Sequence, residues 1–215
     1  MRLACALLAL AAAAAPTFAD SLADRLLPRP HEFARLGGDV RLVDNGAPIA
    51  HIVSANPGSN AIKLGIAQFN TAVESLGGAV LPVVASNEAG RGTLIWVGTR
   101  DEISSLQDLA GGHPIYFPAQ ARVADGHVIE CIRIPGQHII ACVGSDERGC
   151  YYALQTLIQL LRSDGHDVQV PRVAIADRPT YRVRLVKVSG THGDRQVAAL
   201  LSRLSNERQG VDDDL

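Results

Sequence analysis

The chain has 215 residues, a formal net charge of −2 at pH 7 and only 4% aromatic residues. The balanced charge, without a basic stripe interleaved with aromatics, excludes nucleic acid as an expected partner. The scarcity of aromatics disfavours an independent sugar-binding module, because carbohydrate is commonly held by exposed aromatic faces. The length allows one large domain, or one domain followed by part of another.

The N-terminus has the pattern of a secretory signal. Arg2 precedes an apolar run from Leu3 to Ala15 and the helix-breaking Pro16, and the small residues Thr17 and Ala19 then have the spacing that a signal peptidase reads. We expect cleavage after Ala19 and a secreted or periplasmic protein, with an uncleaved anchor as the alternative. The apolar run is shorter than the ~20 residues that span a bilayer, so the sequence predicts no membrane-spanning helix.

The next segment predicts a β-hairpin. Residues 20–37 are polar and punctuated by prolines, which indicates a lead-in that lies over the surface. A strand is expected at Asp39–Val43, and Asn45-Gly46 predicts a turn. Ala50–Val53 is then expected to return as the second strand.

A helix follows the hairpin. Ser59 or Asn60 can cap its start, and Gly77-Gly78 supplies the left-handed backbone that commonly ends a helix. Its apolar residues recur at helical spacing and predict one face packed on a sheet: Ile62, Ile66, Phe69, Val73 and Leu76.

Two compact apolar runs, Val80–Val84 and Thr93–Val97, predict strands that are buried on both faces. Trp96, the sole tryptophan, lies in the second run, so we expect it to be mostly buried. A short amphipathic helix is expected between Thr99 and Ala110 and is stopped by Gly111-Gly112.

A second hairpin is predicted from Val128–Ile134 and His138–Val143. If Gly136 and Gln137 form its two-residue turn, paired residue numbers sum to 273 and Cys131 faces Cys142. These two cysteines then form either a disulfide, which an oxidising compartment permits, or a pair of small apolar residues on one face.

The hairpin leads into another helix and an extended exit. Ser145 or Asp146 can cap the helix, which carries an apolar stripe. Pro171 favours an extended strand from Val168 to Ile175. Strands interleaved with helices predict an α/β (α+β) fold in which helices pack against a mixed sheet.

One further βα unit is expected beyond Tyr181. Val183–Val188 reads as a strand, and a helix is predicted from Gln196 to about Leu204. Thr191 and His192, in the loop between them, are candidate ligand contacts, because barrel enzymes place such contacts after their strands. The alternative is a plain turn.

Three short motifs are incomplete. His31-Glu32 begins an HExxH pattern, but Arg35 stands where the second histidine is required. The stretch Gly90–Ile95 lacks the third glycine of GxGxxG. Asp212–Asp214 is interpreted as a solvated acidic tail, because no later strand holds it in a cleft. The sequence therefore predicts no catalytic, metal-binding or cofactor-binding residue.

Four runs in the second half of the chain resemble the N-terminal accessory domain of bacterial β-N-acetylhexosaminidases: GHVIECIRI, IIACVGSDERG, YALQTLIQLL and VPRVAIADRPTYR. Related domains precede the barrel in glycoside hydrolase families 20 and 84 and in α-glucuronidases. The resemblance is strong over residues 126–182 and compatible from about residue 27. It implies that the matching segments are architectural and that catalysis belongs to a following TIM barrel.

After the signal peptide predicted at 1–19, the resemblance divides the sequence into the accessory domain at 20–179 and the first βα unit of a truncated barrel with an acidic tail at 180–215. The strand at Val183–Val188 lacks the acidic and aromatic residues that family 84 enzymes place there, so no sugar contact is transferred from the family. The function implied is a non-catalytic part of a secreted glycoside hydrolase that acts on glycan through the missing barrel.

The alternative is a stand-alone module that binds glycan or protein and has lost the barrel. Such a module would expose Trp96, or Tyr151 and Tyr152, in a groove. A third possibility is a reading frame that continues beyond this sequence.

Overall fold

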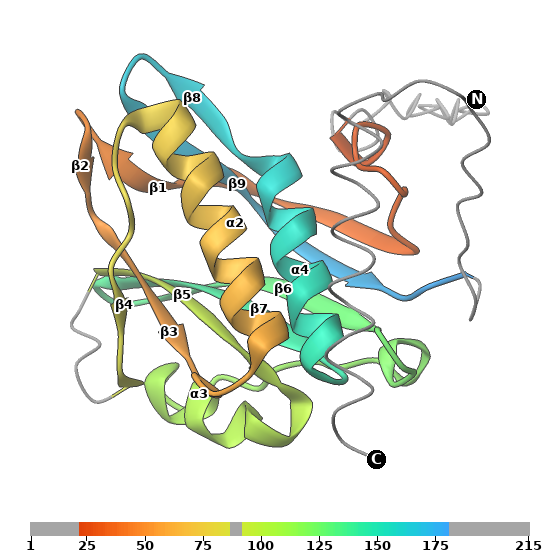
Figure 1. Ribbon diagram of the computed structural model, residues 1–215. Helices are drawn as coiled ribbons and strands as arrows, with labels where there is room; N and C mark the ends of the chain where they lie inside the picture. Colours follow the sequence, from red (N-terminus) through yellow and green to blue (C-terminus); the bar gives the residue numbers. More distant parts are fainter. Residues whose placement is uncertain (1–21, 87–91, 181–215) are drawn as a thin grey trace, which may run out of the picture.

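The computed structural model describes residues 22–86 and 92–180 (Figure 1). The predicted signal peptide, the βα unit after Tyr181, and Thr191 and His192 lie outside the described residues. The longer helices are α2 (Asn60–Gly77) and α4 (Glu147–Leu160), and α3 (Ile103–Leu109) is short. The strands are β1 (Glu32–Asp44), β2 (Ala47–Pro48), β3 (Ala50–Ser54), β4 (Val83–Val84), β5 (Gly92–Thr99), β6 (His127–Ile134), β7 (Gln137–Gly144), β8 (Arg162–Asp164) and β9 (Asp167–Asp177).

These strands form one mixed sheet in the order β2-β1-β9-β6-β7-β5-β3-β4, and β8 pairs with β9. The strands β3, β5 and β7 run parallel to one another, whereas β6, β9 and β1 continue the sheet in antiparallel fashion. The helices α2 and α4 lie side by side across one face of this sheet (Figure 1). The predicted fold class, a mixed sheet with helices packed against it, is confirmed.

Both long helices begin at the predicted caps. Ser59 Oγ accepts a hydrogen bond of 3.4 Å from the backbone N–H of Ile62, and Gly78 ends α2 with φ 71°. Asp146 caps α4 by accepting from the N–H of Gly149 at 2.7 Å. Each cap satisfies one of the backbone donors that a helix start leaves free.

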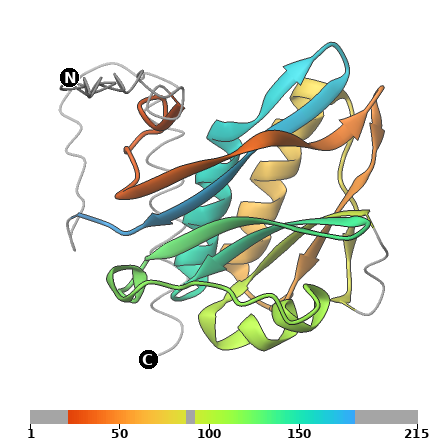
Figure 2. The ribbon, with the colours of Figure 1, turned by 180° about the vertical axis from the view of Figure 1, so that it is seen from behind.

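The larger hydrophobic core lies between the sheet and these two helices, and we call it the helix-face core. Its centre contains Phe69 of α2, Leu154 of α4 and Ile140 of β7, each fully buried. A smaller second-face core lies on the other side of the sheet, which Figure 2 shows from behind. Residues 100–126 cover part of that second face. Trp96 belongs to the second-face core and is fully buried, as predicted.

The first predicted hairpin is only partly correct. The strand β1 begins at Glu32, so residues 32–37 are not a surface lead-in, and its pairing with β9 shifts between Arg35 and Asp39. The turn at Asn45-Gly46 is confirmed by positive φ values of 50° and 77°. The return strand on β1 is the two-residue β2, whereas Ala50–Ser54 pairs with β4 and β5. Parallel neighbours of β3 therefore replace the expected hairpin partner.

One other expectation differs at the edge of the sheet. The run Val80–Val84 contributes only the short strand β4, and Val83 is half exposed because β4 lies at the edge of the sheet formed by the described strands. The extended segment predicted from Val168 to Ile175 is confirmed, and Pro171 lies inside β9. Its missing N–H falls opposite Asp39, at the register shift, where the ladder is already interrupted.

Candidate functional site

The chain leaves the sheet at Asp177, the last residue of β9, and this exit is tied to the start of β1. One oxygen of the nearly buried Asp177 carboxylate lies 2.7 Å from His31 Nδ1 and accepts the backbone N–H of His31 at 3.2 Å. The first and last described parts of the chain are therefore joined at one point. His31, considered above only as the start of a failed zinc motif, is part of this junction.

His127 lies beside the same exit, as the cross-strand partner of Asp177. The imidazole is 4% exposed, and its Nε2 lies 3.3 Å from the hydroxyl of Thr156 on α4. Burial lowers the pKa of His127 to about 4, although the nearby Asp177 carboxylate acts to raise it. The ring is therefore neutral at neutral pH, and it connects β6 to α4 without contacting solvent.

The loop between β7 and α4 contains the Gly-Ser-Asp-Glu-Arg-Gly run, and its glycines are required by close backbone contacts. A Cβ on Gly144 would lie 2.3 Å from the carbonyl oxygen of Asp146, and one on Gly149 would lie 2.4 Å from the carbonyl oxygen of Gly126. The Asp146 carboxylate also accepts the backbone N–H of Asp125 at 2.9 Å. This motif therefore holds the loop before β6 against the start of α4, which is an architectural role.

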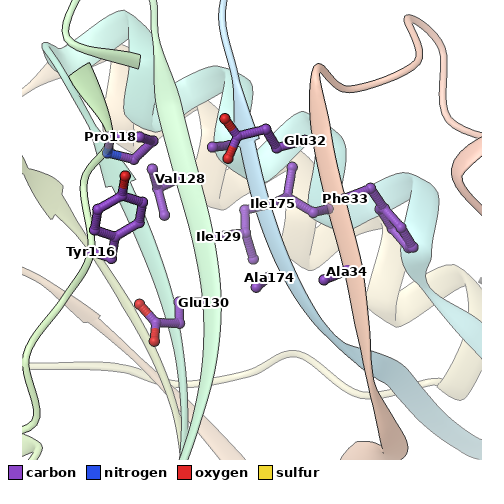
Figure 3. A pocket seen from close by; sticks show the side chains of 11 residues that line it. Glu32, Phe33, Ala34, Tyr116, Pro118, Val128, Ile129, Glu130, Ala174 and Ile175 are labelled. Carbon is purple, nitrogen blue, oxygen red and sulfur yellow. The ribbon is translucent and has the colours of Figure 1, made fainter. Parts of the chain in front are cut away.

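An open groove lies on the second face of the sheet, where β1, β9 and β6 run together (Figure 3). Its volume is about 240 Å³. Small and apolar side chains line it, including Ala34, Ala174 and Val128. Figure 3 shows Tyr116 and Pro118 on one side of this groove and β1 on the other.

Polar groups stand at the rim of the groove. Glu32 accepts a hydrogen bond from the Gln120 amide, and Glu130 Oε1 lies 3.3 Å from His113 Nε2. Tyr116 is 72% exposed, so its ring presents an aromatic face to solvent. An aromatic ring with carboxylate acceptors can contact a sugar ring and its hydroxyls. Sequence reasoning missed this groove, because its residues come from three strands and a loop that are distant in the chain.

The predicted facing of Cys131 and Cys142 is wrong. In the structure Cys131 pairs with Ile140 and Cys142 with Ile129, so paired residue numbers sum to 271. The turn is Pro135-Gly136, with Gly136 at φ 75°, because proline favours the first central position of a type II turn and glycine the second. The two cysteines are thus diagonal neighbours, too far apart for an unstrained bridge, and both thiols are free.

Cys131, Cys142 and Cys150 are buried thiols of the helix-face core. Burial raises the pKa of Cys131, raises that of Cys150 to about 12 and raises that of Cys142 well above its usual range. Protonated, buried thiols are poor nucleophiles and poor metal ligands. They therefore act as small apolar residues.

The residues expected to mark a sugar-binding module do not form an exposed aromatic groove. Trp96 is fully buried, and Tyr151 and Tyr152 on α4 are partly buried and packed edge to face, with ring centres 5.5 Å apart. Within residues 22–86 and 92–180, no three His, Cys, Asp or Glu side chains come together as metal ligands. None of the helices in these ranges is long and apolar enough to span a membrane.

Comparison with known proteins decides the family. The model described as glycosyl hydrolase family 20, domain 2, matches residues 23–178, which is most of the chain and ends one residue after Asp177. The chain belongs to this family. The resemblance to the accessory domain of family 20 hexosaminidases is thereby confirmed.

Two solved structures, CpGH84B and CpGH84D, share this fold. CpGH84B superposes on 79% of the chain with a TM-score of 0.53 at 16% identity, and CpGH84D on 70% with a TM-score of 0.50 at 15% identity. The family 20 β-N-acetylhexosaminidase of Streptomyces coelicolor A3(2) superposes on 74%, with a TM-score of 0.49 at 18% identity. Because these identities are all below 25%, the superpositions of CpGH84B and CpGH84D show a shared fold and nothing about function. The matched part covers 25%, 23% and 27% of those chains, so this family 20 domain spans about a quarter of their length.

Proposed function

We propose that this family 20 domain is the non-catalytic accessory domain of a secreted glycoside hydrolase of the β-N-acetylhexosaminidase type. The observation that carries the proposal is the family match over residues 23–178, whose end coincides with the exit of β9 at Asp177. A following domain would begin where the chain leaves the sheet. The division into an accessory domain at 20–179 and a barrel start at 180–215 is part of this proposal.

The chemistry inside the described domain supports a structural role. His127 and the three thiols, its most perturbed titratable groups, are shut off from solvent in the cores. Glycosidases instead flank the scissile bond with two accessible carboxyl groups, about 5–10 Å apart, that share acid and base work. Hydrolysis of a β-linked N-acetylhexosamine would therefore fall to residues of the following barrel.

The purified chain should give no turnover of chromogenic N-acetylglucosaminides above a blank. Release of the chromophore that depends on protein concentration would refute the non-catalytic assignment. The matched control is the Tyr116→Ala variant, because any genuine sugar chemistry in the groove would depend on that ring, whereas a contaminating glycosidase would not.

The predicted export of the protein can be tested separately. The signal predicts a mature protein that starts at Asp20, which mass spectrometry of protein recovered from the periplasm or medium would identify. Recovery of the uncleaved chain from the membrane fraction would support the anchor instead.

A glycan-binding module is the second candidate function, and the exposed Tyr116 beside Glu32 and Glu130 favours it. Saturation-transfer NMR with N-acetylglucosamine oligosaccharides tests it on the same protein. Transfer to the sugar that disappears in Tyr116→Ala would support the groove as a glycan contact. Equal transfer in both proteins, or none in either, would remove this candidate.

A further inference from the structure

The floor of the groove beside Tyr116 is formed by small side chains on the second face of the sheet. Two rows of paired residues cross β1, β9 and β6 there: Glu32-Ala176-Val128 and Ala34-Ala174-Glu130. The rows are two residues apart along each strand, so all six side chains leave the same face, and all six line the groove. The floor between the two glutamates is therefore made of alanine and valine.

Glu32 and Glu130 stand at opposite corners of this floor. The strand β9 lies between their strands, so their backbones are two strand spacings, or about 10 Å, apart across the sheet. Figure 3 shows Glu130 on the side of the groove that carries Tyr116. Within the described residues only Oε1 of each carboxylate has a hydrogen-bond partner, whereas an ionised carboxylate has about four acceptor sites. Both glutamates can therefore accept from a ligand that lies between them.

The charge of the lining selects the ligand. Among the described residues that line the groove, Glu32 and Glu130 are the only charged ones. Gln120, the partner of Glu32, is a neutral amide, and His113, the partner of Glu130, stands outside the lining. Carboxylates repel an anionic ligand and attract a cation, and the exposed ring of Tyr116 attracts a cation as well. The lining therefore complements a ligand that carries positive charge.

The size and the apolar surfaces of the groove narrow the ligand further. Its volume of about 240 Å³ is below the ~300–1,000 Å³ of pockets that enclose drug-sized molecules, so it suits one small ring. The alanines and the Tyr116 ring provide apolar contact for the C–H face of a sugar ring. A hexosamine with a free 2-amino group adds an ammonium, whose three N–H donors form charge-assisted hydrogen bonds to carboxylates. An acetylated amino group offers a single neutral N–H.

We propose that the groove beside Tyr116 binds a hexosamine unit whose 2-amino group is free and protonated, as in a glucosamine oligosaccharide. The sugar ring lies on the alanine floor against Tyr116, its ammonium donates to one of the two carboxylates, and its hydroxyl groups donate to the other. The proposal rests on the proposed function, because it takes the sugar class from a glycoside hydrolase domain. It names the glycan that the second candidate function leaves open.

The test is an NMR titration of the isotope-labelled full chain at about pH 7, where such an amine is mostly protonated and exposed carboxylates are ionised. The two ligands are the trisaccharides of glucosamine and of N-acetylglucosamine. We expect the free amine to bind about tenfold more tightly, because a hydrogen bond between charged groups exceeds a neutral one by roughly that factor. The backbone amide signals of Ala174 and Ala176 should shift during the titration.

Variants of the two carboxylates test whether the preference arises in the groove. It should shrink in Glu32→Gln and in Glu130→Gln and vanish in the double variant. The control is Glu74→Gln, which removes the same charge from an exposed position of α2, on the other side of the sheet, and should keep the full preference. Should Glu130→Gln fail to fold, Glu32→Gln decides, because Glu32 is exposed. A preference that persists in the double variant, or that falls equally in Glu74→Gln, would overturn the site, because the net negative charge of the protein would then explain it.

The remaining outcomes separate this proposal from the proposed function. Equal affinity for the two trisaccharides, lost for both in Tyr116→Ala, would overturn the preference for a free amine and leave the glycan-binding candidate standing. Absence of binding by either trisaccharide would overturn the site, whereas the accessory role is judged separately by the turnover assay. Trilysine tests for a peptide ligand: affinity equal to that of the glucosamine trisaccharide at the same amides would replace the sugar with a basic peptide.

Discussion

The two faces of the sheet are built differently. The helix-face core is closed by two long amphipathic helices, capped at Ser59 and Asp146, that pack side by side. The second face is covered by residues 100–126, which contain only short helical turns, and beyond them the groove beside Tyr116 stays open. The closed face therefore carries most of the stability, whereas the open face retains surface that can contact a ligand.

The strongest test of this contrast is Phe69→Ala. Phe69 is fully buried in the helix-face core, and truncating such a side chain lowers the free energy of unfolding by about 3–5 kcal/mol. Tyr116→Ala, on the open face, should change it by no more than about 0.5 kcal/mol, because the ring is mostly exposed. Urea unfolding followed by circular dichroism measures both. Equal losses of unfolding free energy in the two variants would contradict the conclusion that the helix-face core carries most of the stability.

A slightly smaller effect is expected from pH, through His127 on the helix side of the sheet. Its pKa falls from 6.5 to about 4 on folding, so the stability that the neutral ring contributes is fully present above pH 6.5 and is lost as the pH falls towards 4. This difference corresponds to about 3 kcal/mol. Unfolding free energies measured across this window should decline in the wild type and decline less steeply in His127→Gln. An unchanged slope in the variant would assign the pH dependence to other groups.

Gly149→Ala tests how tightly the closed face is assembled. The added Cβ would lie 2.4 Å from the backbone oxygen of Gly126, which cannot move aside cheaply, so we expect a loss of about 1–3 kcal/mol. Gly65→Ala is the matched control within α2. Its Cβ would meet the end of the flexible Leu154 side chain at 2.8 Å, and alanine favours the helix. Thermal unfolding should therefore separate the two variants, and equal losses would contradict the role assigned to the loop.

The smallest effect is expected from the caps. Removing a cap costs about 1 kcal/mol, and Asp146→Ala should exceed Ser59→Ala because the Asp146 carboxylate accepts two backbone N–H groups. The second of these belongs to Asp125, in the segment that covers the second face. Hydrogen exchange should therefore quicken at Asp125 in Asp146→Ala but not in Ser59→Ala. Unchanged exchange at Asp125 would show that the two faces are assembled independently.

Sequence reasoning succeeded where neighbouring residues decide the structure. The two long helices, their caps, the turn at Asn45-Gly46 and the burial of Trp96 follow from spacings of a few residues. It failed where the partner lies far along the chain: Ala50–Ser54 pairs with β5 and not with β1. One failure was local. The hairpin β6–β7 was correct as a unit, but choosing Gly136-Gln137 over Pro135-Gly136 as its turn displaced every pair by two residues, so that Cys142 was expected opposite Cys131 in place of Ile140.

The amino-acid sequence by itself determined the elements and the family, because capping, helical periodicity and the run from Gly126 to Arg182 are local properties of the chain. Only the tertiary structure decided which strands are neighbours, since the pairs between β1 and β9 join residues 125 to 144 positions apart and those between β6 and β9 join residues 44 to 50 positions apart. That neighbour order creates the groove beside Tyr116 and the junction at Asp177. Neither has a signature within any one segment of the sequence.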